Sequence, residues 1–316
     1  MNIIVRQNSG LGNQLFQYAA GRYLAKRYDA SLQVSEELDH KLVSFGHPRP
    51  VLLRKFAVRA EVRAASYFDR LVLSTRRRFQ LLAKLARAAC NIQVIRQNPE
   101  RFLFHQELQI AAGVRTAYLA GFWQDSEIVQ KIEPELRREF SLIDPLCGKD
   151  LEVAQRIAAA EHAISLHFRR GDYASFFGRE MLLSREYYER AMGHFVKQNP
   201  RSTFFVFSDD FKFAHEWSRG DPRIVIVDHN DATRGHEDMR LMSLCRHHII
   251  ANSTFSWWGA WLNPRTDKMV IAPKHWYNTE DSYYPDLLPQ TWLLADVANV
   301  ADQCFDEIEE TSLSSS

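Results

Sequence analysis

The chain has 316 residues, of which 46% are hydrophobic and 25% are charged, and 40 Lys and Arg face 39 Asp and Glu. This composition is typical of a globular protein and excludes collagen, coiled coils and disordered chains. At roughly 100 to 200 residues per domain, the length predicts two domains. The four cysteines form no C-x-x-C pair, so they indicate neither a disulfide framework nor a zinc site and favour a reducing compartment.

The chain begins with a pattern typical of a strand, a helix and a second strand. An apolar run at Ile3–Val5 is followed by a glycine turn, a helical pattern over about 14–28 and a second apolar run at Leu32–Val34. This order predicts a βαβ unit. The N-terminus lacks the basic flank and long apolar stretch of a signal peptide, and no apolar run approaches the roughly 20 residues that span a bilayer. We therefore expect a cytoplasmic protein, or one attached peripherally at a membrane surface.

The next stretch, residues 49–101, is strongly basic. It holds 13 Lys and Arg against 3 Asp and Glu, a local charge of +10, and much of it fits helices with apolar stripes such as Phe79, Leu82, Leu85 and Ala86. One interpretation is a solvated helical face, and the other is a contact surface for an anionic partner. Because the stretch lacks the regular aromatic spacing of single-strand binders, peripheral membrane contact is a better interpretation than nucleic-acid binding, and the solvated helical face stays an equally good one.

The second half alternates regularly between apolar runs and helical patterns, which predicts a parallel sheet covered on both faces. Such sheets bind ligands beyond the carboxyl ends of their strands. The predicted strands are 163–168, 204–207, 224–227, 249–251 and 269–272, and the predicted helices are 185–198, 211–218, 237–246 and 256–262. The end of the chain, 302–316, carries five acids and no base, and its composition predicts disorder.

The first candidate site is the turn Gly10-Leu11-Gly12-Asn13-Gln14 after the first predicted strand. Gly10 and Gly12 allow a tight turn and the close approach of a ligand, and the amides of Asn13 and Gln14 suit sugar hydroxyls or phosphates. A turn that only caps a helix is an equally good interpretation. The spacing is not G-x-G-x-x-G, so it gives no support to dinucleotide binding.

The second candidate is His167-Phe168-Arg169-Arg170-Gly171-Asp172-Tyr173, where a predicted strand ends. Arginines in this position can neutralise a pyrophosphate through charge-assisted hydrogen bonds. Because adjacent residues of an extended segment point to opposite sides, Arg169 and Arg170 should differ in role, one facing the ligand and the other a carboxylate such as Asp172. The alternative is a solvated surface ion pair.

The third candidate is the acid pair that follows the predicted strand 204–207. Asp209 and Asp210 could hold a divalent metal, accept hydrogen bonds from a ribose or a guanine, or cap the next helix. Capping is the default for one of them, so we expect at least one to contact a ligand.

The fourth candidate is the turn Ser253-Thr254-Phe255-Ser256, which precedes a short predicted helix. Hydroxyl groups and free N–H groups at a helix N-terminus favour phosphate. Simple N-capping is the alternative. We expect Trp257, Trp258 and Trp261 to lie mostly in the core and the turn itself to be functional.

Taken in their order along the chain, these motifs closely resemble those of the α-1,2-fucosyltransferases of glycosyltransferase family 11. The similarity extends from about residue 2 to Trp292 and is weakest over 35–115. Two departures are minor, since Ser9 stands where the family usually has Gly and Phe168 where Val is common. The matching segments are Gly10–Ala19, Gly121–Gln124, His167–Tyr173, Phe204–Asp210, Ile249–Asn263 and Val270–Lys274.

The resemblance implies an α/β, GT-B-like fold in which two Rossmann-like α/β domains face a cleft. Residues 1–150 would form an acceptor-side domain with a basic helical insertion, and 151–300 the domain that binds GDP-fucose. Residues 301–316 would form the acidic, disordered tail. By similarity, Arg169 would hold the β-phosphate, and His167 with Asp209 or Asp210 would contact the guanine. The pyrophosphate would be bound by Thr254–Ser256. The loop Gly10–Gln14 would line the cleft near the fucose or the acceptor.

The implied reaction is the inverting transfer of L-fucose from GDP-β-L-fucose to the 2-hydroxyl of a terminal β-galactoside, in glycan or surface polysaccharide synthesis. We expect no cofactor and no metal, and an acceptor that can be lipid-linked. Asp172 is our first choice for a base, with Glu180 and Asp125 as alternatives. Two rival interpretations stay open. Asp209 and Asp210 could form the metal pair of a metal-dependent nucleotide-sugar transferase of other specificity, or the chain could be a non-catalytic basic membrane- or nucleic-acid-binding protein.

Overall fold

The computed structural model describes residues 1–36, 50–97, 108–171, 182–276 and 287–296. The chain divides into two compact units, each with its own sheet. Unit 1 comprises Met1–Pro145 with Asp231–His236, and unit 2 comprises Leu146–Asn230 with Glu237–Ser316. The acidic tail lies outside the described residues. No helix in the described ranges is long and apolar enough to cross a membrane.

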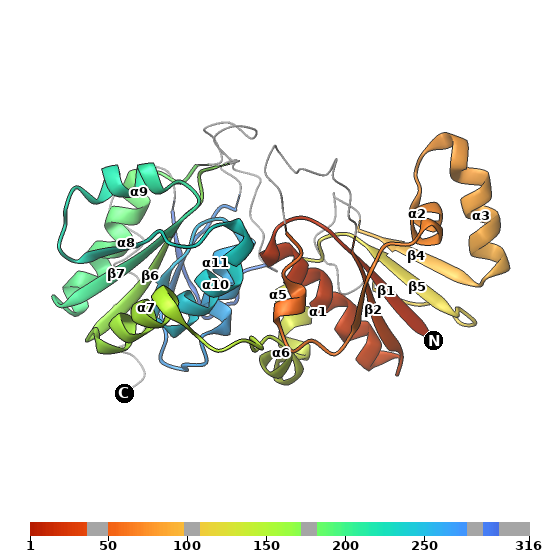
Figure 1. The fold of residues 1–316 in the computed structure, drawn as a ribbon, viewed down its shortest axis with the longest axis horizontal. Helices are drawn as coiled ribbons and strands as arrows, with labels where there is room; N and C mark the ends of the chain where they lie inside the picture. The colour runs from red at the N-terminus through yellow and green to blue at the C-terminus, as the bar shows by residue number, and fades with distance from the viewer. Residues whose placement is uncertain (37–49, 98–107, 172–181, 277–286, 297–316) are drawn as a thin grey trace. The chain divides into compact units, whose positions relative to one another are not determined.

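Unit 1 is built on a parallel sheet with the strand order β3-β2-β1-β5-β4 (Figure 1). The predicted βαβ opening is confirmed, because helix α1 (Leu11–Arg27) connects the parallel strands β1 and β2. The strands are β1 (Asn2–Gln7), β2 (Ser31–Glu36), β3 (Glu61–Ala64), β4 (Ile92–Arg96) and β5 (Thr116–Ala120).

Opposite faces of β1 contact different helices, as the alternation of side chains along a strand requires. Ile4 packs with Val72 of helix α2 (Tyr67–Leu73), whereas Val5 lies against Gly21 of α1. A Cβ atom at Gly21 would lie 2.2 Å from Val5 Cγ2, so only glycine permits this approach of helix to sheet.

The basic stretch contains helices, as expected, namely α2 and α3 (Gln80–Ala89). The same stretch also holds strands β3 and β4, which the sequence pattern missed. Both are edge strands of the sheet. None of the β3 residues is buried and β4 buries only Ile95. The apolar alternation covers only Val62 and Ala64 in β3 and Ile92 and Val94 in β4, which is too short to identify a strand beside strong helical patterns. The remaining short elements of unit 1 are η2 (Leu53–Lys55), η3 (Arg77–Phe79), α5 (Ser126–Lys131) and α6 (Glu133–Glu139).

Unit 2 confirms the predicted parallel sheet, with the strand order β11-β10-β9-β6-β7-β8. Its strands are β6 (His162–Phe168), β7 (Ser202–Ser208), β8 (Ile224–Val227), β9 (His247–Ile249), β10 (Val270–Pro273) and β11 (Leu293–Ala295). The helical segments are α7 (Gly148–Ala159), α8 (Arg185–Gln198), α9 (Phe211–Ser218), α10 (Gly235–Leu244) and α11 (Thr254–Leu262). The short helix η6 (Ala232–Arg234) lies in the segment Asp231–His236, which belongs to unit 1. The boundary expected after residue 150 falls within α7.

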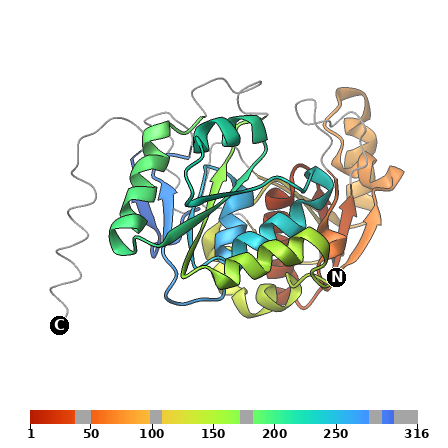
Figure 2. The same ribbon diagram turned by 60° about the vertical axis from the view of Figure 1, so that its left-hand side comes forward.

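Helices cover both faces of this sheet (Figure 2). Each face has its own apolar core. On one side, α8 and α9 pack on Leu166 and Phe168 of β6. On the other side, α7 and α10 pack on Phe205 and Phe207 of β7. Phe168, which replaces the Val common in the family, is fully buried and its ring meets that of Trp217 edge-on at 4.9 Å.

The strand order reverses within each sheet. In unit 2 the chain runs from β6 outward to β7 and β8, and then returns to the other side of β6 to form β9, β10 and β11. In unit 1 the corresponding reversal lies between β1 and β5. Because loops on the two sides of such a switch point diverge, it is where open parallel sheets bind their ligands. The candidate ligand sites are therefore the carboxyl ends of β6 and β9 in unit 2, and of β1 and β5 in unit 1.

Candidate functional site

Three of the four predicted motifs follow neighbouring strands at the carboxyl edge of the unit 2 sheet. Arg169 and Arg170 come directly after β6, Asp209 and Asp210 after β7, and the Ser253 turn after β9. Their strands are adjacent in the order β9-β6-β7. The fold thus brings together residues that are more than 80 positions apart in the sequence.

Asp209 ties the ends of β6 and β7 together. Its Oδ2 atom accepts a hydrogen bond of 2.5 Å from Arg169 Nη1, and its Oδ1 atom accepts from the backbone N–H groups of Arg170 at 2.8 Å and Gly171 at 3.1 Å. Burial alone would raise the pKa of Asp209, but the charge of Arg169 and the two backbone donors hold this pKa below its usual value. Asp209 therefore stays ionised at neutral pH and fixes both the position of Arg169 and the course of the chain after it.

Asp210 is the helix cap of the pair. Its Oδ1 atom accepts the N–H of Phe213 at 3.0 Å at the start of α9. Arg170 lies over the same helix, with its guanidinium carbon 3.7 Å from the centre of the Phe213 ring and its Nε 3.8 Å from Asp210 Oδ2. The two arginines thus have different surroundings, but each lies beside a carboxylate, and the predicted division into one ligand-facing and one carboxylate-facing arginine stays a prediction. Their carboxylate partners are Asp209 and Asp210, while Asp172, the partner named from the sequence, lies outside the described residues.

His167, the last-but-one residue of β6, is a buried imidazole with an unused polar atom. The residue is 4% exposed, its ring centre lies 5.5 Å from that of Phe255, and Nδ1 has no hydrogen-bond partner among the described residues. Burial lowers the pKa of His167 well below its ordinary value, and the nearby carboxylate of Asp209 offsets this only partly. The ring is therefore neutral at neutral pH and carries a polar group that lacks a partner.

The turn after β9 begins helix α11. Ser253 caps the helix by accepting the N–H of Phe255 at 3.3 Å. Ser256 is buried, and its hydroxyl lies 3.2 Å from the carbonyl oxygen of Ser253, to which it donates. The Ser256 hydroxyl thus donates within the turn, whereas Ser253 uses its hydroxyl oxygen only as an acceptor, so an anion here would be bound by the Ser253 hydroxyl, Thr254 and the backbone N–H groups. The expected core position of the tryptophans is confirmed, since Trp257, Trp258 and Trp261 are buried.

The Gly10 turn belongs to unit 1 and precedes α1. Gln14 is fully buried, its Nε2 donates to the carbonyl oxygens of Ser9 and Pro50, both at 2.9 Å, and its Oε1 accepts from the N–H of Leu52 at 3.0 Å. All of its amide hydrogens are thus used to hold the turn against the segment at 50–52. Gln14 positions this loop from inside, whereas Gly10 and Gly12 form the helix start.

The segment after β5 joins the Gly10 turn at the reversal point of the unit 1 sheet. Asn13 accepts a hydrogen bond of 2.8 Å from Gln124 Nε2 and donates one of 3.0 Å to Ser9 Oγ. In the sequence Gln124 is only part of the matching segment Gly121–Gln124, whereas in the structure it holds Asn13. Ser9 has φ +69°, a conformation that favours glycine, which accounts for the Gly that the family usually has at this position.

Gln97 is a residue that the sequence analysis missed. Its Oε1 atom accepts the backbone N–H groups of Phe122 at 2.5 Å and Trp123 at 3.1 Å, and thereby fixes the turn after β5. It lies directly after edge strand β4 in a segment without a distinctive motif, so no sequence signal marked it.

Carboxylates considered as catalytic bases have different positions. Asp125 is fully buried and caps α5 by accepting the N–H groups of Glu127 at 2.8 Å and Ile128 at 3.1 Å, which gives it a structural role. Asp172 and Glu180 lie outside the described residues. Within the part of the chain that the structure covers, no cluster of three or more His, Cys, Asp and Glu side chains could hold a metal ion.

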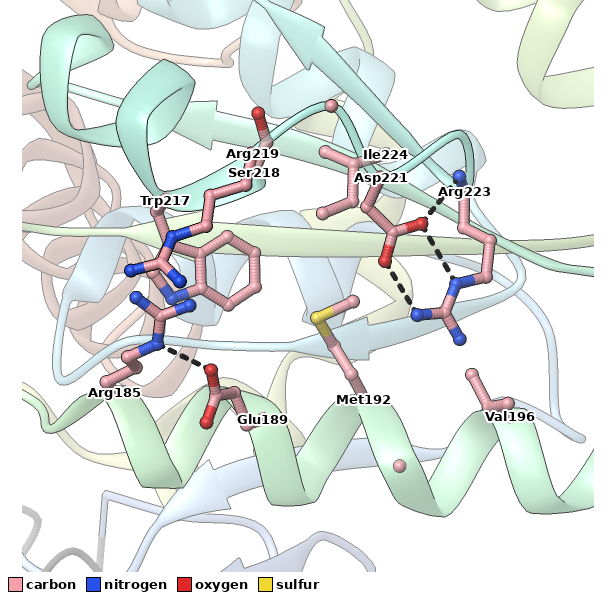
Figure 3. A pocket seen from close by; sticks show the side chains of 12 residues that line it. Arg185, Glu189, Met192, Val196, Trp217, Ser218, Arg219, Asp221, Arg223 and Ile224 are labelled. Atoms are coloured by element: carbon pink, nitrogen blue, oxygen red, sulfur yellow. Dashed lines mark hydrogen bonds and ion pairs between the residues drawn. The ribbon is translucent and has the colours of Figure 1, made fainter.

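A separate pocket of about 560 Å³ lies between α8 and the turn after α9 (Figure 3). Four of its charged side chains form two pairs, because Arg185 contacts Glu189 at 2.5 Å and Arg223 contacts Asp221 at 2.6 Å. Arg219 also lines the pocket. None of its lining residues belongs to the predicted motifs. This pocket is therefore distinct from the site at the carboxyl edge of the sheet.

Comparison with known proteins connects this arrangement to sugar transfer. A family model described as glycosyl transferase family 11 matches residues 104–293, more than half of the chain. An O-antigen biosynthesis glycosyltransferase, WbnK, of Escherichia coli is 29% identical over 85% of this chain and 93% of its own length. An alpha-1,2-colitosyltransferase of Escherichia coli is 28% identical over 92% of this chain and 98% of its own.

The fold is similar to that of a solved glycosyltransferase. The crystal structure of fucosyltransferase NodZ from Bradyrhizobium matches with a TM-score of 0.52 and 16% identity, over 83% of this chain and 93% of NodZ. At this identity the likeness concerns the fold alone. The predicted α/β, GT-B-like fold class is confirmed.

Proposed function

Because the chain belongs to glycosyl transferase family 11, we propose that it transfers L-fucose from GDP-β-L-fucose to the 2-hydroxyl of a terminal β-galactoside. The observation that carries this proposal is Arg169, held by Asp209 at the carboxyl end of β6. Beside it lie the neutral, partly unpartnered imidazole of His167 and the N-terminus of α11. Positive charge and backbone donors at a switch point suit a nucleoside diphosphate.

In the proposed reaction the galactose 2-hydroxyl attacks the anomeric carbon on the side opposite to GDP. The bond from that carbon to the β-phosphate oxygen breaks, the hydroxyl proton leaves, and the configuration inverts from β to α. Negative charge develops on the β-phosphate as the bond breaks. Arg169 is fixed before the reaction, so it stabilises this charge without reorganising, which is the strongest form of electrostatic catalysis. We assign the guanine to His167 and the pyrophosphate to the N–H groups of the Thr254 turn.

The hydroxyl proton needs an acceptor, or the reaction must be dissociative enough to proceed without a strong base. Asp172 is our proposal for this role, because it is the nearest carboxylate in sequence to Arg169 and Gly171. Asp125 is the weaker choice, since it is fully buried and its Oδ1 atom already caps α5.

A second donor sugar is supported by a specific observation. The relative that is similar over 92% of this chain is named an alpha-1,2-colitosyltransferase, and colitose is fucose without its 3-hydroxyl group. The nucleotide-binding residues would be the same for both donors, whereas a site that binds the 3-hydroxyl would discriminate against colitose. The O-antigen relative favours a surface polysaccharide as the acceptor in either case.

The deciding experiment is to incubate the chain with GDP-fucose or GDP-colitose and a panel of β1,3- and β1,4-linked galactosides, and to establish the linkage of each product. We expect an α-1,2-fucosylated galactoside, formed at an unchanged rate in EDTA. A product with colitose only would replace the proposed donor, and loss of activity in EDTA would favour a metal-dependent enzyme. No transfer from either donor would reject the proposed function.

The small size of residue 171 offers a sharper test of the Arg169 geometry. A Cβ atom at Gly171 would lie 3.0 Å from Asp209 Oδ2, the atom that accepts from Arg169, and 3.2 Å from Asp209 Cγ. We expect Gly171→Ala to displace this carboxylate by a few tenths of an ångström and to lower kcat by about tenfold, since catalysis depends on such positioning. Gly193→Ala is the control, because a Cβ atom at Gly193 meets nothing within 4 Å. Equal activity of both variants would contradict the role given to Asp209.

A further inference from the structure

Helix α3 of unit 1 turns its apolar face toward solvent. Leu81, Leu82 and Leu85 are 69%, 54% and 57% exposed, and the exposed residues Ala88 and Ala89 extend the same stripe at helical spacing. Soluble proteins rarely expose neighbouring large apolar side chains in this way, and such patches mark interaction sites. We call this surface the α3 leucine face.

The opposite side of α3 anchors the helix to its unit. Ala83 is fully buried, and the Arg87 guanidinium donates two hydrogen bonds, of 2.9 Å and 2.5 Å, to the carbonyl oxygen of Val72 in α2. The α2–α3 hairpin lies next to edge strand β4 (Figure 1). The leucine face is therefore held outward by packing on the other side of the helix.

Exposed basic side chains occur on α2, directly before α3 and on α3 itself. Arg70, Arg76–Arg78 and Lys84 are exposed, and in the described ranges none of them has an ion-pair partner. Asp69 is the one acidic residue between 62 and 97, and it is buried and bonded to Arg63 and Tyr118. The cations around α3 are thus not neutralised by nearby acids of their own segment.

We propose that the α3 leucine face docks on an anionic membrane surface, with the leucines inserted below the headgroups and the arginines in contact with lipid phosphates. An amphipathic helix with an apolar stripe and a basic rim is built for this interface. Nucleic acid would use the arginines but leave the leucines in water. A second copy of the chain would bring its own uncompensated arginines to the contact. The proposal does not rest on the enzymatic assignment.

The test is co-sedimentation of the full chain with phosphatidylcholine vesicles, with and without phosphatidylglycerol, at low and high ionic strength. We expect binding to the anionic vesicles only, and weaker binding at high salt. Each basic residue near such a surface contributes about fivefold to binding, so the triple variant Arg76→Gln, Arg77→Gln, Arg78→Gln should bind roughly a hundredfold more weakly. The triple variant Leu81→Gln, Leu82→Gln, Leu85→Gln should lose at least about tenfold.

Matched controls carry the same changes on exposed positions of unit 2. Two control variants should bind as the parent does. One carries the leucine changes Leu151→Gln and Leu244→Gln, and the other carries the basic changes Lys149→Gln, Arg156→Gln and Lys197→Gln. Circular dichroism and thermal unfolding establish that every variant is folded. Absence of vesicle binding by the parent at low salt would overturn the proposal. Leucine variants that bind vesicles like the parent would also overturn it. A third contradicting result would be a dimer, observed by sedimentation velocity, that the leucine changes dissociate without weakening vesicle binding.

Discussion

Replacing Arg169 with Ala is expected to lower kcat for fucose transfer by at least about 10²–10³, the effect of removing one preorganised donor to a developing oxyanion. The loss should appear mainly in kcat, because the charge on the β-phosphate grows as the glycosidic bond breaks. Arg169→Lys should recover only part of the rate, since an ammonium group cannot reproduce the forked geometry of a guanidinium. The measurement is steady-state kinetics with GDP-fucose, together with GDP affinity by calorimetry.

Arg201→Ala is the matched control for this experiment. Arg201 lies in the same unit, its side chain is 80% exposed and it pairs with Glu161 at 2.8 Å on the surface. Its removal should leave kcat unchanged. If Arg169→Ala transferred fucose at the parental rate, the assignment of the phosphate-binding residue would be wrong, even if the chain were still a fucosyltransferase.

The second large effect expected is acid destabilisation of unit 2. Burial lowers the pKa of His167 and His248 well below the ordinary value and lowers that of His247 to about 4. In the unfolded chain these imidazoles bind protons near pH 6.5. Their contribution to stability is therefore fully present above that pH and is lost as the pH falls toward the folded-state pKa values. Between about pH 7 and pH 5, each imidazole that stays neutral in the folded state lowers the free energy of unfolding by about 2 kcal/mol.

His248 shows why the folded state resists the proton. Its Nε2 atom accepts a hydrogen bond of 2.8 Å from Asn263 Nδ2, and its Nδ1 is 2.7 Å from Ser165 Oγ. A proton on Nε2 would remove that acceptor and set two donors against each other in a fully buried position. For His167, His247 and His248 together, the expected loss of unfolding free energy is about 6 kcal/mol, which is a large part of the stability of an ordinary domain.

Urea unfolding at about pH 7 and pH 5 measures this loss directly. His248→Gln keeps an amide in place of the ring, and it should reduce the difference between the two pH values by about 2 kcal/mol. Ile249→Val, a buried change on the next residue, should lower stability equally at both pH values. Equal free energies of unfolding for the parent at the two pH values would contradict the neutral state of these histidines.

Most of unit 2 could be predicted from the sequence, because buried parallel strands are continuous apolar runs with clear helical patterns between them. The runs at 163–168 and 224–227 match β6 and β8 closely, whereas β9 begins and ends two residues before the predicted 249–251. Its histidines, His247 and His248, are buried polar residues that interrupt the apolar signal. Unit 1 was less predictable, since its edge strands β3 and β4 bury almost nothing.

The candidate site shows the same limit in its side chains. Residue types indicated which groups could bind a phosphate, but not which ones the fold uses internally. Gln14 offered an amide for a ligand, yet its hydrogen bonds go to Ser9, Pro50 and Leu52. Of the two acids after β7, only the structure distinguishes the cap, Asp210, from Asp209, which holds Arg169. Such choices depend on contacts between segments far apart in the chain.

The register between β6 and β7 has a consequence for engineering. Phe168 pairs with Ser208, so Arg169 and Asp209 are the first residues beyond matched positions on adjacent strands. Their contact is therefore set by the hydrogen-bonding ladder of the sheet and not by the conformation of a loop. Because Asp209 also binds the N–H groups of Arg170 and Gly171, the loops can be exchanged only beyond these residues. A library that seeks new sugar donors should hold Arg169 to Gly171 and Asp209 constant and vary the segments that follow them.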